Sequence, residues 1–451
     1  MKIANTLCAV LLAVTFKLHA TQLESVAGTL HELITDTQIS QLTLTGTINA
    51  ADIEWLTDNL PQLSRLDITD ARITAYSGPR LHSGHTTSPA DHLPDYSLMG
   101  SNIIDIILPR TLTGIGSAAL AATPITHISL PATITHIGTG AFAGCTSLTA
   151  ISLPAGITTI SPLTFKGCTS LTTVSLPAGL QTIGNEAFRD CTSLTTVSLP
   201  AGLQTIGNSA MSHTALTHID LSHCTRLSSI GSWTFAHCHN LETATLSQAT
   251  TTVGDGLFFD CNTLTAVNIS TNITALTPYM FKGTTLRGYP TLTGPNTRSI
   301  GEYALYGNDL ITQLWLPRTL THIGTRAMAH MTALERIDAS YLTELPTLGQ
   351  QVFQGTASPA VTIEAIESIA PLMQVTEQWK EFNIVTVDEP DLSHSADIHT
   401  VTVYTLNATI LQRHTTDPAT RVTLPLPRRG ATVIVELQLT DHSRHTYKIV
   451  I

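Results

Sequence analysis

The chain carries little charge, and the charge it has is not clustered. Only 12% of its 451 residues are Asp, Glu, Lys or Arg, about half the share of an average soluble protein. The 22 basic residues are outnumbered by 33 acidic ones and form no long run. Nucleic acids and anionic lipid surfaces are bound through clustered Lys and Arg. The composition therefore argues against both as partners.

Catalytic and nucleotide-binding motifs are also missing. The chain has no nucleophile elbow, P-loop or dinucleotide fingerprint, and the glycines around Gly138 belong to a repeat. Acidic pairs such as Glu186 and Asp190 are expected on the outer edge of that repeat. They would lack the sheltered setting that raises a carboxyl pKa for acid–base catalysis. We therefore expect no enzyme and no cofactor.

No apolar run reaches the ~20 residues that a membrane-spanning helix needs. The apolar stretch 7–16 instead follows Lys2 and ends shortly before Ala20, a pattern typical of a secretory signal peptide. Cys8 stands at the start of this stretch, whereas a lipoprotein signal has its cysteine at the end. We predict that residues 1–20 are removed, which leaves 20 basic against 33 acidic residues in an exported chain.

What the sequence does contain is a repeat of about 23 residues. The stretch CTSLTTVSLPAGLQTIGN occurs twice unchanged, beginning at Cys168 and at Cys191. The same register, with steps of 22 to 25 residues, passes through Leu108, Leu130, Leu153, Leu176, Leu199, Leu221, Leu246, Ile269, Leu292, Leu316 and Ala339. These positions predict about eleven turns of one array.

Each unit reads L-T-x-I-x-L-P-x-x-L-x-x-I-G-x-x-A-F-x-x-C. Ile151 and Leu153 alternate as in a half-buried strand, and Pro154 ends that strand because it has no N–H to donate. Glycines such as Gly184 suit a tight bend, and the following Ala-Phe pair, as at Phe188, is expected to fill the space between coils. A single unit cannot bury these residues alone, so the units must stack.

The sequence thus predicts a mainly β repeat solenoid with short helical or 3-10 segments. Strand spacing of roughly 4.8 Å per coil gives an array on the order of 50 Å long. We assign residues 21–100 to an N-terminal cap with a polar loop, 101–358 to the repeat array, and 359–388 to a C-terminal cap.

The L-P strand end, the I-G bend and the A-F-x-x-C segment closely resemble the BspA-like leucine-rich repeats of bacterial surface proteins. The likeness covers roughly residues 103–356. The segments AGTLHELI from Ala27 and LTLTGTINAADIEWL resemble that family's N-terminal cap, and Trp379-Lys-Glu-Phe382 resembles the segment that closes such arrays. The resemblance implies attachment to host or bacterial surface proteins, extracellular matrix or glycans.

The final segment, residues 389–451, begins with a linker and is predicted to be a small β domain. Residues 401–407, 432–439 and 447–451 have alternating or β-branched patterns that predict three or four strands. The opening V-x-V-Y-x-L-N and the terminal K-I-V-I resemble the C-terminal sorting domain of proteins exported by the type IX pathway. That resemblance implies an extracellular or outer-membrane location in a Gram-negative bacterium. A simple β cap or stalk is the alternative.

Cysteine and histidine also follow the repeat. Five of the seven cysteines share one repeat position: Cys145, Cys168, Cys191, Cys238 and Cys261. Side chains at equivalent positions point in parallel, so we expect a ladder of free buried thiols, with Thr214 at the missing rung. Cys224 lies outside it and is the thiol most worth testing. His213 and His237 share another position, near His239. The chain has no H-E-x-x-H motif and no close cysteine pair beside them, so we predict no metal site.

Binding is expected on the outward strand positions. In the first half these are a nearly uniform set of Thr and Ser, and they diversify from His218 onward. The candidate binding residues are His218, Asp220, Asn268, Gln313, Trp315, Arg336 and Asp338. Trp and Arg are enriched at binding hot spots, although Trp315 could equally cover a neighbouring coil.

The sequence therefore favours a secreted or surface-attached adhesion protein. The alternative is a structural component of a surface layer or biofilm matrix without a discrete ligand. A metal-dependent enzyme using the histidines is the least favoured hypothesis.

Overall fold

The computed structural model describes residues 20–81, 84–287, 292, 296–356, 358–388, 398–405, 410–415, 432–439 and 444–450. The predicted signal peptide lies outside the described residues except for Ala20. The chain divides into two compact units, one ending at Val387 and one beginning at Asp388. No helix in the described ranges is long and apolar enough to cross a membrane.

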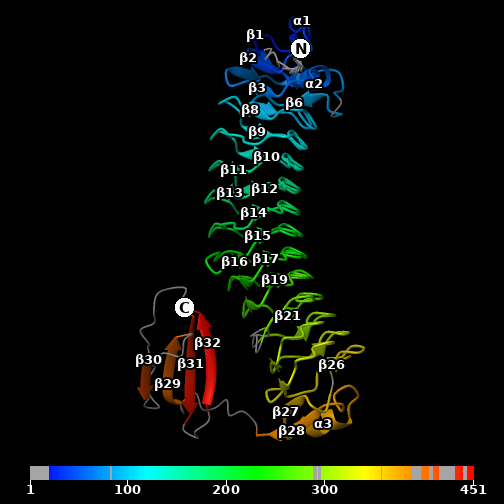
Figure 1. Cartoon of the computed structure of the whole chain (residues 1–451), viewed down its shortest axis with the longest axis vertical. Coiled ribbons are helices and arrows are strands. Elements are labelled where there is room, and N and C mark those ends of the chain that lie inside the picture. The colour runs from blue at the N-terminus through cyan, green and yellow to red at the C-terminus, as the bar shows by residue number, and fades with distance from the viewer. Residues whose placement is uncertain are drawn as a thin grey trace, which may run out of the picture. The chain divides into compact units, whose positions relative to one another are not determined.

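The first unit begins with a cap in which parallel strands meet two helices (Figure 1). Its elements are β1 (Ala20–Ser25), α1 (Leu30–Leu33), β2 (Gln41–Ile48), α2 (Ala50–Asn59), β3 (Arg65–Asp67), β4 (Ala71–Ile73), β5 (Tyr76–Ser77), β6 (Thr87–Ser88) and β7 (His92–Leu93).

Asp52 holds this cap together. Its buried carboxylate accepts hydrogen bonds from the backbone N–H groups of Gly28 (2.7 Å), Leu30 (3.1 Å) and Asn49 (2.9 Å). The Asn49 side chain in turn caps α2 by accepting from the N–H of Asp52, which satisfies donors that a helix start leaves free. One carboxylate therefore joins the start of α1 to the start of α2.

Beyond the cap, most coils contribute one strand to a first parallel ladder, the strand face. Its strands are β8 (Asp105–Ile107), β11 (Ala150–Ser152), β13 (Thr173–Ser175), β16 (His218–Asp220), β18 (Thr243–Thr245), β20 (Ala266–Asn268), β23 (Gln313–Trp315) and β25 (Arg336–Asp338). Ile151 pairs with Val174 in register, both are buried, and the residues on either side point outward. The predicted alternation is confirmed.

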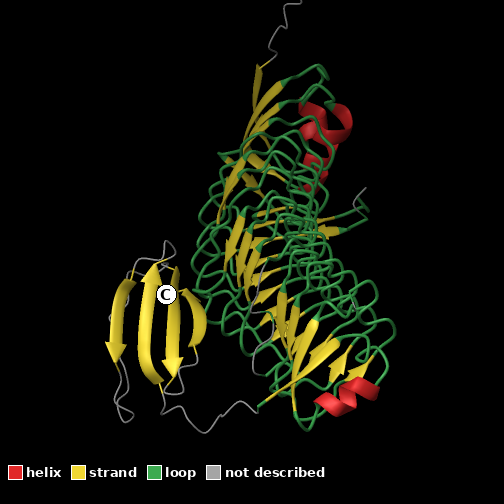
Figure 2. Ribbon diagram, turned by 60° about the horizontal axis from the view of Figure 1, so that its bottom comes forward, coloured by secondary structure: helices red, strands yellow, loops and turns green. Residues whose placement is uncertain are grey.

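A second parallel ladder is built from two-residue strands, eleven of them in the described part of the array. They are β9 (Gly114–Ile115), β10 (His136–Ile137), β12 (Thr159–Ile160), β14 (Thr182–Ile183), β15 (Thr205–Ile206), β17 (Ser229–Ile230), β19 (Thr252–Val253), β21 (Ala275–Leu276), β22 (Ser299–Ile300), β24 (His322–Ile323) and β26 (Thr347–Leu348). Figure 2 shows the strands of successive coils stacked in rows, with turns between them.

Glycine follows nine of these eleven strands, and it is required for a different reason than the one we predicted. Gly207 does not have a positive φ. A Cβ added to it would lie 2.6 Å from the backbone nitrogen of Asn185 in the preceding coil, and Gly184 and Gly231 meet backbone atoms of their preceding coils in the same way. Glycine is therefore needed because two coils approach closely, and not because the bend needs a left-handed residue.

Left-handed residues occur instead in the turns that follow, which form a third ladder, the turn face. Each coil has two of them, four residues apart, as at Glu186 (φ 55°) and Asp190 (φ 61°). Backbone bonds run from coil to coil between them, for example from Glu186 N to Asn208 O (2.8 Å) and from Asp190 N to Ser212 O (3.0 Å). These turns occupy the place of the expected short helical segments.

The core between the three ladders is a stack of phenylalanines. The rings of Phe165 and Phe188 lie 5.3 Å apart at an interplanar angle of 13°, and Phe235, Phe258 and Phe281 stack in the same manner. All are fully buried. The prediction that the Ala-Phe pair fills the space between coils is confirmed.

The array is followed by β27 (Thr362–Ile366), α3 (Ala370–Val375) and β28 (Asn383–Val387), and the two strands continue the strand face beyond β25. Buried Trp379 packs its ring 4.8 Å from Phe353, and Phe382 contacts Phe353 edge-on at 5.0 Å. Large rings thus cover the last coil of the core.

The second unit contains a four-stranded antiparallel sheet with the order β30-β29-β31-β32. Its strands are β29 (Ile398–Thr405), β30 (Ile410–Thr415), β31 (Thr432–Leu439) and β32 (Arg444–Val450). β29, β31 and β32 overlap the three strand segments predicted from the sequence, and β30 is a strand that the sequence patterns did not single out.

Candidate binding surfaces

The structure separates the seven predicted binding residues into two groups. His218, Asp220 and Asn268 belong to the sheet β16-β18-β20, whereas the other four lie on β23 and β25 of another sheet. In the first group, His218 Nδ1 lies 2.9 Å from Thr243 Oγ1, and Asp220 accepts a hydrogen bond from Ser222 N (2.9 Å). Asp220 and Asn268 both pair with Thr245, one on each side.

The second group is brought together by strand register. Gln313 pairs with Arg336, and Trp315 pairs with Asp338. The Arg336 guanidinium donates to the Glu364 carboxylate on β27, and the Trp315 ring meets Tyr341 edge-on at 5.7 Å. Asp338 accepts from Ser340 N–H (3.1 Å) and hydroxyl (2.6 Å). These side chains are half-buried and already paired within the chain, so they form a well-ordered surface.

A second surface, which the sequence analysis missed, lies on the turn face. It is a row of half-buried aromatic side chains on consecutive coils, called here the aromatic row: Trp233, Phe259, Tyr279, Tyr303 and Tyr306.

The rings of the aromatic row are closely packed. Tyr279 and Tyr303 stack at 5.3 Å with an interplanar angle of 8°, and Trp233 meets Phe259 edge-on at 5.2 Å. A Cβ on Gly256 would lie 2.3 Å from the Trp233 ring. The glycine at the intervening coil therefore makes room for the indole, which reaches Tyr279 at 6.1 Å.

Lys282 sits at the centre of the aromatic row. Its Nζ lies between 5.0 and 5.8 Å from the ring centroids of Phe259, Tyr279, Tyr303 and Tyr306, within the range of cation–π attraction. Burial, and then Glu302, raises the pKa of Tyr279. Its hydroxyl is a hydrogen-bond donor at neutral pH, as that of an ordinary tyrosine is. The surface combines rings, hydroxyls and one cation.

The histidines occupy the turn face as well. The His213 and His237 rings stack at 4.4 Å, and His237 Nδ1 lies 3.1 Å from Asp260 Oδ2 in the next coil. His239 approaches the His237 ring at 6.0 Å. Burial and the neighbouring His237 lower the pKa of His213. The side chains of His237, His239 and Asp260 could share one metal ion, an arrangement the sequence analysis did not predict.

The cysteines form the expected ladder of free thiols. Each thiol donates to a carbonyl of the preceding coil, as from Cys191 Sγ to Phe165 O (3.1 Å), and Thr214 takes the missing rung with a bond to Met211 O (2.9 Å). Cys224 is buried, and burial raises its pKa to about 11. It is therefore not an activated nucleophile.

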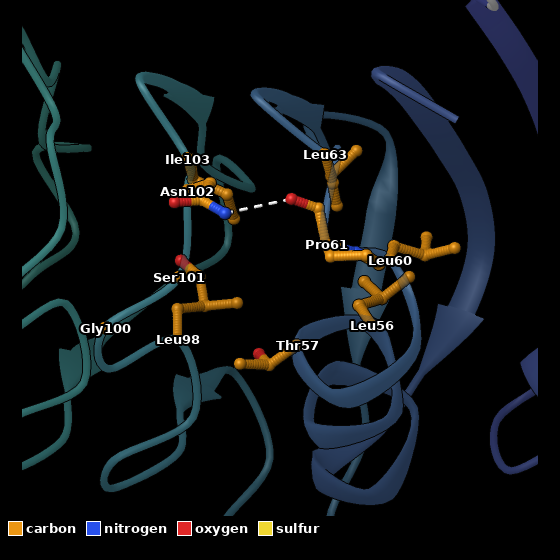
Figure 3. Close-up of a pocket in the computed structure, with 10 residues that line it drawn as sticks. All are labelled: Leu56, Thr57, Leu60, Pro61, Leu63, Leu98, Gly100, Ser101, Asn102 and Ile103. Carbon is orange, nitrogen blue, oxygen red and sulfur yellow. Dashed lines mark hydrogen bonds between the residues drawn. The ribbon is translucent and has the colours of Figure 1, made fainter. Parts of the chain in front are cut away.

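A cavity of about 130 Å³ lies between α2 and the first coils, lined by Leu56, Thr57, Leu60, Pro61, Leu63, Leu98, Gly100, Ser101, Asn102 and Ile103 (Figure 3). The Asn102 amide donates to Pro61 O across it (2.9 Å), and the Thr57 hydroxyl donates to Ser97 O (2.9 Å). Its volume is below the ~300 Å³ at which ligand pockets begin. We interpret it as a small packing gap between the N-terminal cap and the repeat array.

A solved structure resembles the chain in fold. A leucine-rich repeat protein from Bacteroides ovatus is similar with a TM-score of 0.62 and 22% identity, over 77% of this chain and 84% of that one. A leucine-rich cell surface protein from Faecalibacterium prausnitzii is 20% identical with a TM-score of 0.34, over 64% of this chain and 87% of that one. No curated protein matches the chain significantly.

The family assignment comes from the repeats themselves. Six copies of the pattern described as a BspA type leucine-rich repeat region match residues 74–177, 158–287 and 290–373, about two thirds of the chain. They include the coils that carry the strand face, the turn face and the aromatic row. The chain belongs to the BspA-type leucine-rich repeat family.

Proposed function

We propose that this protein is a surface-attached adhesion protein that binds another protein through the aromatic row. The predicted signal peptide and the resemblance of the last segment to a sorting domain support export to the bacterial surface. The likeness of the array to other leucine-rich repeats supports binding rather than catalysis, because stacked repeats offer long, rigid surfaces.

The single observation that carries the proposal is the aromatic row itself. Only 5% of the residues of this chain are aromatic, yet five of them gather on four adjacent coils of one face. Tyr and Trp are enriched among residues that dominate binding energy, because they bury a large area at little entropic cost. Stacked rings expose edges and hydroxyls rather than open faces, a composition that favours a protein partner over a sugar ring.

The row is also held rigidly before any partner arrives. Backbone bonds join its coils, from Tyr279 N to Glu302 O (2.9 Å) and from Tyr303 N to Thr325 O (3.0 Å). The Arg326 guanidinium donates to the Tyr303 hydroxyl (3.2 Å). A surface that is already ordered loses less conformational entropy on binding.

The test is binding of the mature full chain to immobilised matrix proteins, bacterial surface proteins and glycans. We expect saturable binding to a protein. Replacing Tyr279 and Tyr303 together by Ala should weaken it at least about thirtyfold, the effect of losing a hot spot of ~2 kcal/mol. The matched control replaces Thr173 and Thr196, on the uniform part of the strand face, and should leave affinity unchanged.

Two results would contradict the proposal. Absence of any saturable ligand across the panel would favour a structural component of a surface layer or biofilm matrix. Binding to glycans alone would exclude the protein partner that the packed rings favour.

A further inference from the structure

One row of the turn face differs from the rest of the array. At the second left-handed position of four consecutive coils stand Asp190, His213, His237 and Asp260, with φ of 61°, 57°, 58° and 56°. Glycine occupies this position in six other coils: Gly100, Gly144, Gly167, Gly283, Gly307 and Gly355. Asp and His adopt the left-handed backbone more readily than most residues. The fold therefore accepts them at this position, but glycine would serve it equally well.

His239 gives the row a third direction of approach. It stands two residues beyond the left-handed position, and its side chain turns toward the row. One ligating atom from each of His237, His239 and Asp260 lies within 4.8 Å of the others. Side chains from the turns of two adjacent coils and from one loop thus meet at one point of the surface. The repeat does not need these residue types there in order to fold.

We propose that His237, His239 and Asp260 bind one divalent transition-metal ion of the Zn²⁺ type. In tetrahedral zinc sites the ligands lie about 2.0–2.2 Å from the metal, which places neighbouring ligand atoms ~3.3 Å apart. His237 Nδ1 and Asp260 Oδ2 already lie 3.1 Å apart. His239 is exposed, so its ring can turn the remaining distance without moving the core.

The chemistry of the three side chains selects the ion. Two imidazole nitrogens and one carboxylate oxygen suit zinc and similar borderline ions, whereas Mg²⁺ and Ca²⁺ prefer oxygen-only sites. The His213 ring, stacked on His237 at an interplanar angle of 18°, fixes the orientation of that ligand from the preceding coil.

Three protein ligands leave a fourth position open. The site borders a shallow hollow lined by Thr192, His213, Thr214, Ala215, His237, His239 and Asn240, so this position faces solvent. Water, or a side chain of a partner, would complete the coordination. The site adjoins the aromatic row, because the His237 ring meets Phe259 edge-on at 5.3 Å. Metal binding does not depend on the proposed adhesion.

Calorimetric titration of Zn²⁺ into the mature, tag-free full chain tests the proposal. We expect one ion per chain and no binding of Mg²⁺. His237→Gly and Asp260→Gly should each weaken Zn²⁺ binding by more than about tenfold, as should His239→Ala. Glycine is the appropriate replacement at the first two positions because it fits their left-handed backbone, so the variants should keep the native circular dichroism spectrum.

His330→Gly is the matched control. His330 has the same repeat position and a φ of 57°, but it belongs to no group of three metal-ligating side chains in the described ranges. This variant should bind Zn²⁺ as the parent does. Absence of stoichiometric binding, unchanged affinity in His239→Ala, or equal weakening in His330→Gly would overturn the proposal. Co²⁺ as a probe should give the visible spectrum of a four-coordinate ion, which nonspecific surface binding would not.

Discussion

Replacing one ring of the phenylalanine stack should destabilise the array more than most single substitutions do. Phe188 is fully buried between Phe165, whose ring lies 5.3 Å away, and Met211 of the next coil. The surrounding backbone cannot collapse into the space left by Phe188→Ala, because ladder bonds fix it: Phe188 N donates to Ala210 O (2.8 Å) and Phe165 N to Ala187 O (2.8 Å). We therefore expect a loss of about 4 kcal/mol, within the range for large buried rings.

Phe188→Met provides the matched control. The neighbouring coil already carries a fully buried Met211 at this repeat position, so the site accepts a thioether chain of similar volume. The loss should stay below about 1.5 kcal/mol. Urea unfolding followed by circular dichroism measures the unfolding free energy of both variants, with the dependence on urea concentration fixed at the value of the parent chain. Coil-resolved hydrogen exchange shows whether the loss is local, because repeat arrays need not unfold as one unit.

A loss below about 1 kcal/mol for Phe188→Ala would show that the coils can relax into the space. Equal losses for the Ala and Met variants would show that ring stacking, and not volume, stabilises this position. Either result would refute the packing argument for the core.

The remaining predictions concern the thiols and the glycines. Burial raises the pKa of Cys224 from its ordinary value of 9.0 to about 11, so the thiol should resist alkylation at pH 8 in the native chain and react after unfolding. Alkylation of the native chain at pH 8 would contradict the raised pKa. Because the pKa of this thiol is higher in the folded chain than in the unfolded one, its contribution to stability is complete below pH 9 and is lost as the pH rises from 9 towards 11. Gly207→Ala should destabilise the array by about 2–3 kcal/mol, because its Cβ would lie 2.6 Å from a backbone nitrogen of Asn185. Gly202→Ala, whose nearest neighbour would be at 3.5 Å, should change the unfolding free energy by less than about 1 kcal/mol; similar losses for both glycines would refute the close-approach explanation.

Features that recur in every unit could be predicted from the sequence. Phe188 and Cys191 repeat at fixed offsets from the strand, so their burial follows from stacking alone. The first left-handed position of each turn could not be predicted in the same way, because it is occupied by residues as different as Glu186, Trp233 and Arg326. Their shared conformation comes from the backbone ladder between coils, which no residue type signals.

The candidate surfaces were predicted unevenly for the same reason. Residues such as Trp315 lie on strands whose alternation shows which side chains point outward. Tyr279 and Tyr303 lie in turns. Their contact can be predicted only when the coils are aligned so that Gly301 and Thr277, each two residues before a tyrosine, share one repeat position. Asp260 shares the repeat position of His237, and aligning the coils would have shown the pair. The partner of Arg336 is Glu364 on β27, beyond the regular repeat, where the period no longer gives the register.

The strand-face residues predicted from the sequence and the aromatic row are alternative binding sites for the protein ligand. The dissociation constant of a protein ligand, measured for two double variants, separates them most directly. Replacing Tyr279 and Tyr303 by Ala should raise it at least about thirtyfold, whereas replacing Gln313 and Trp315 should change it less than about threefold. The opposite order would contradict the account, and would place binding on the strand face.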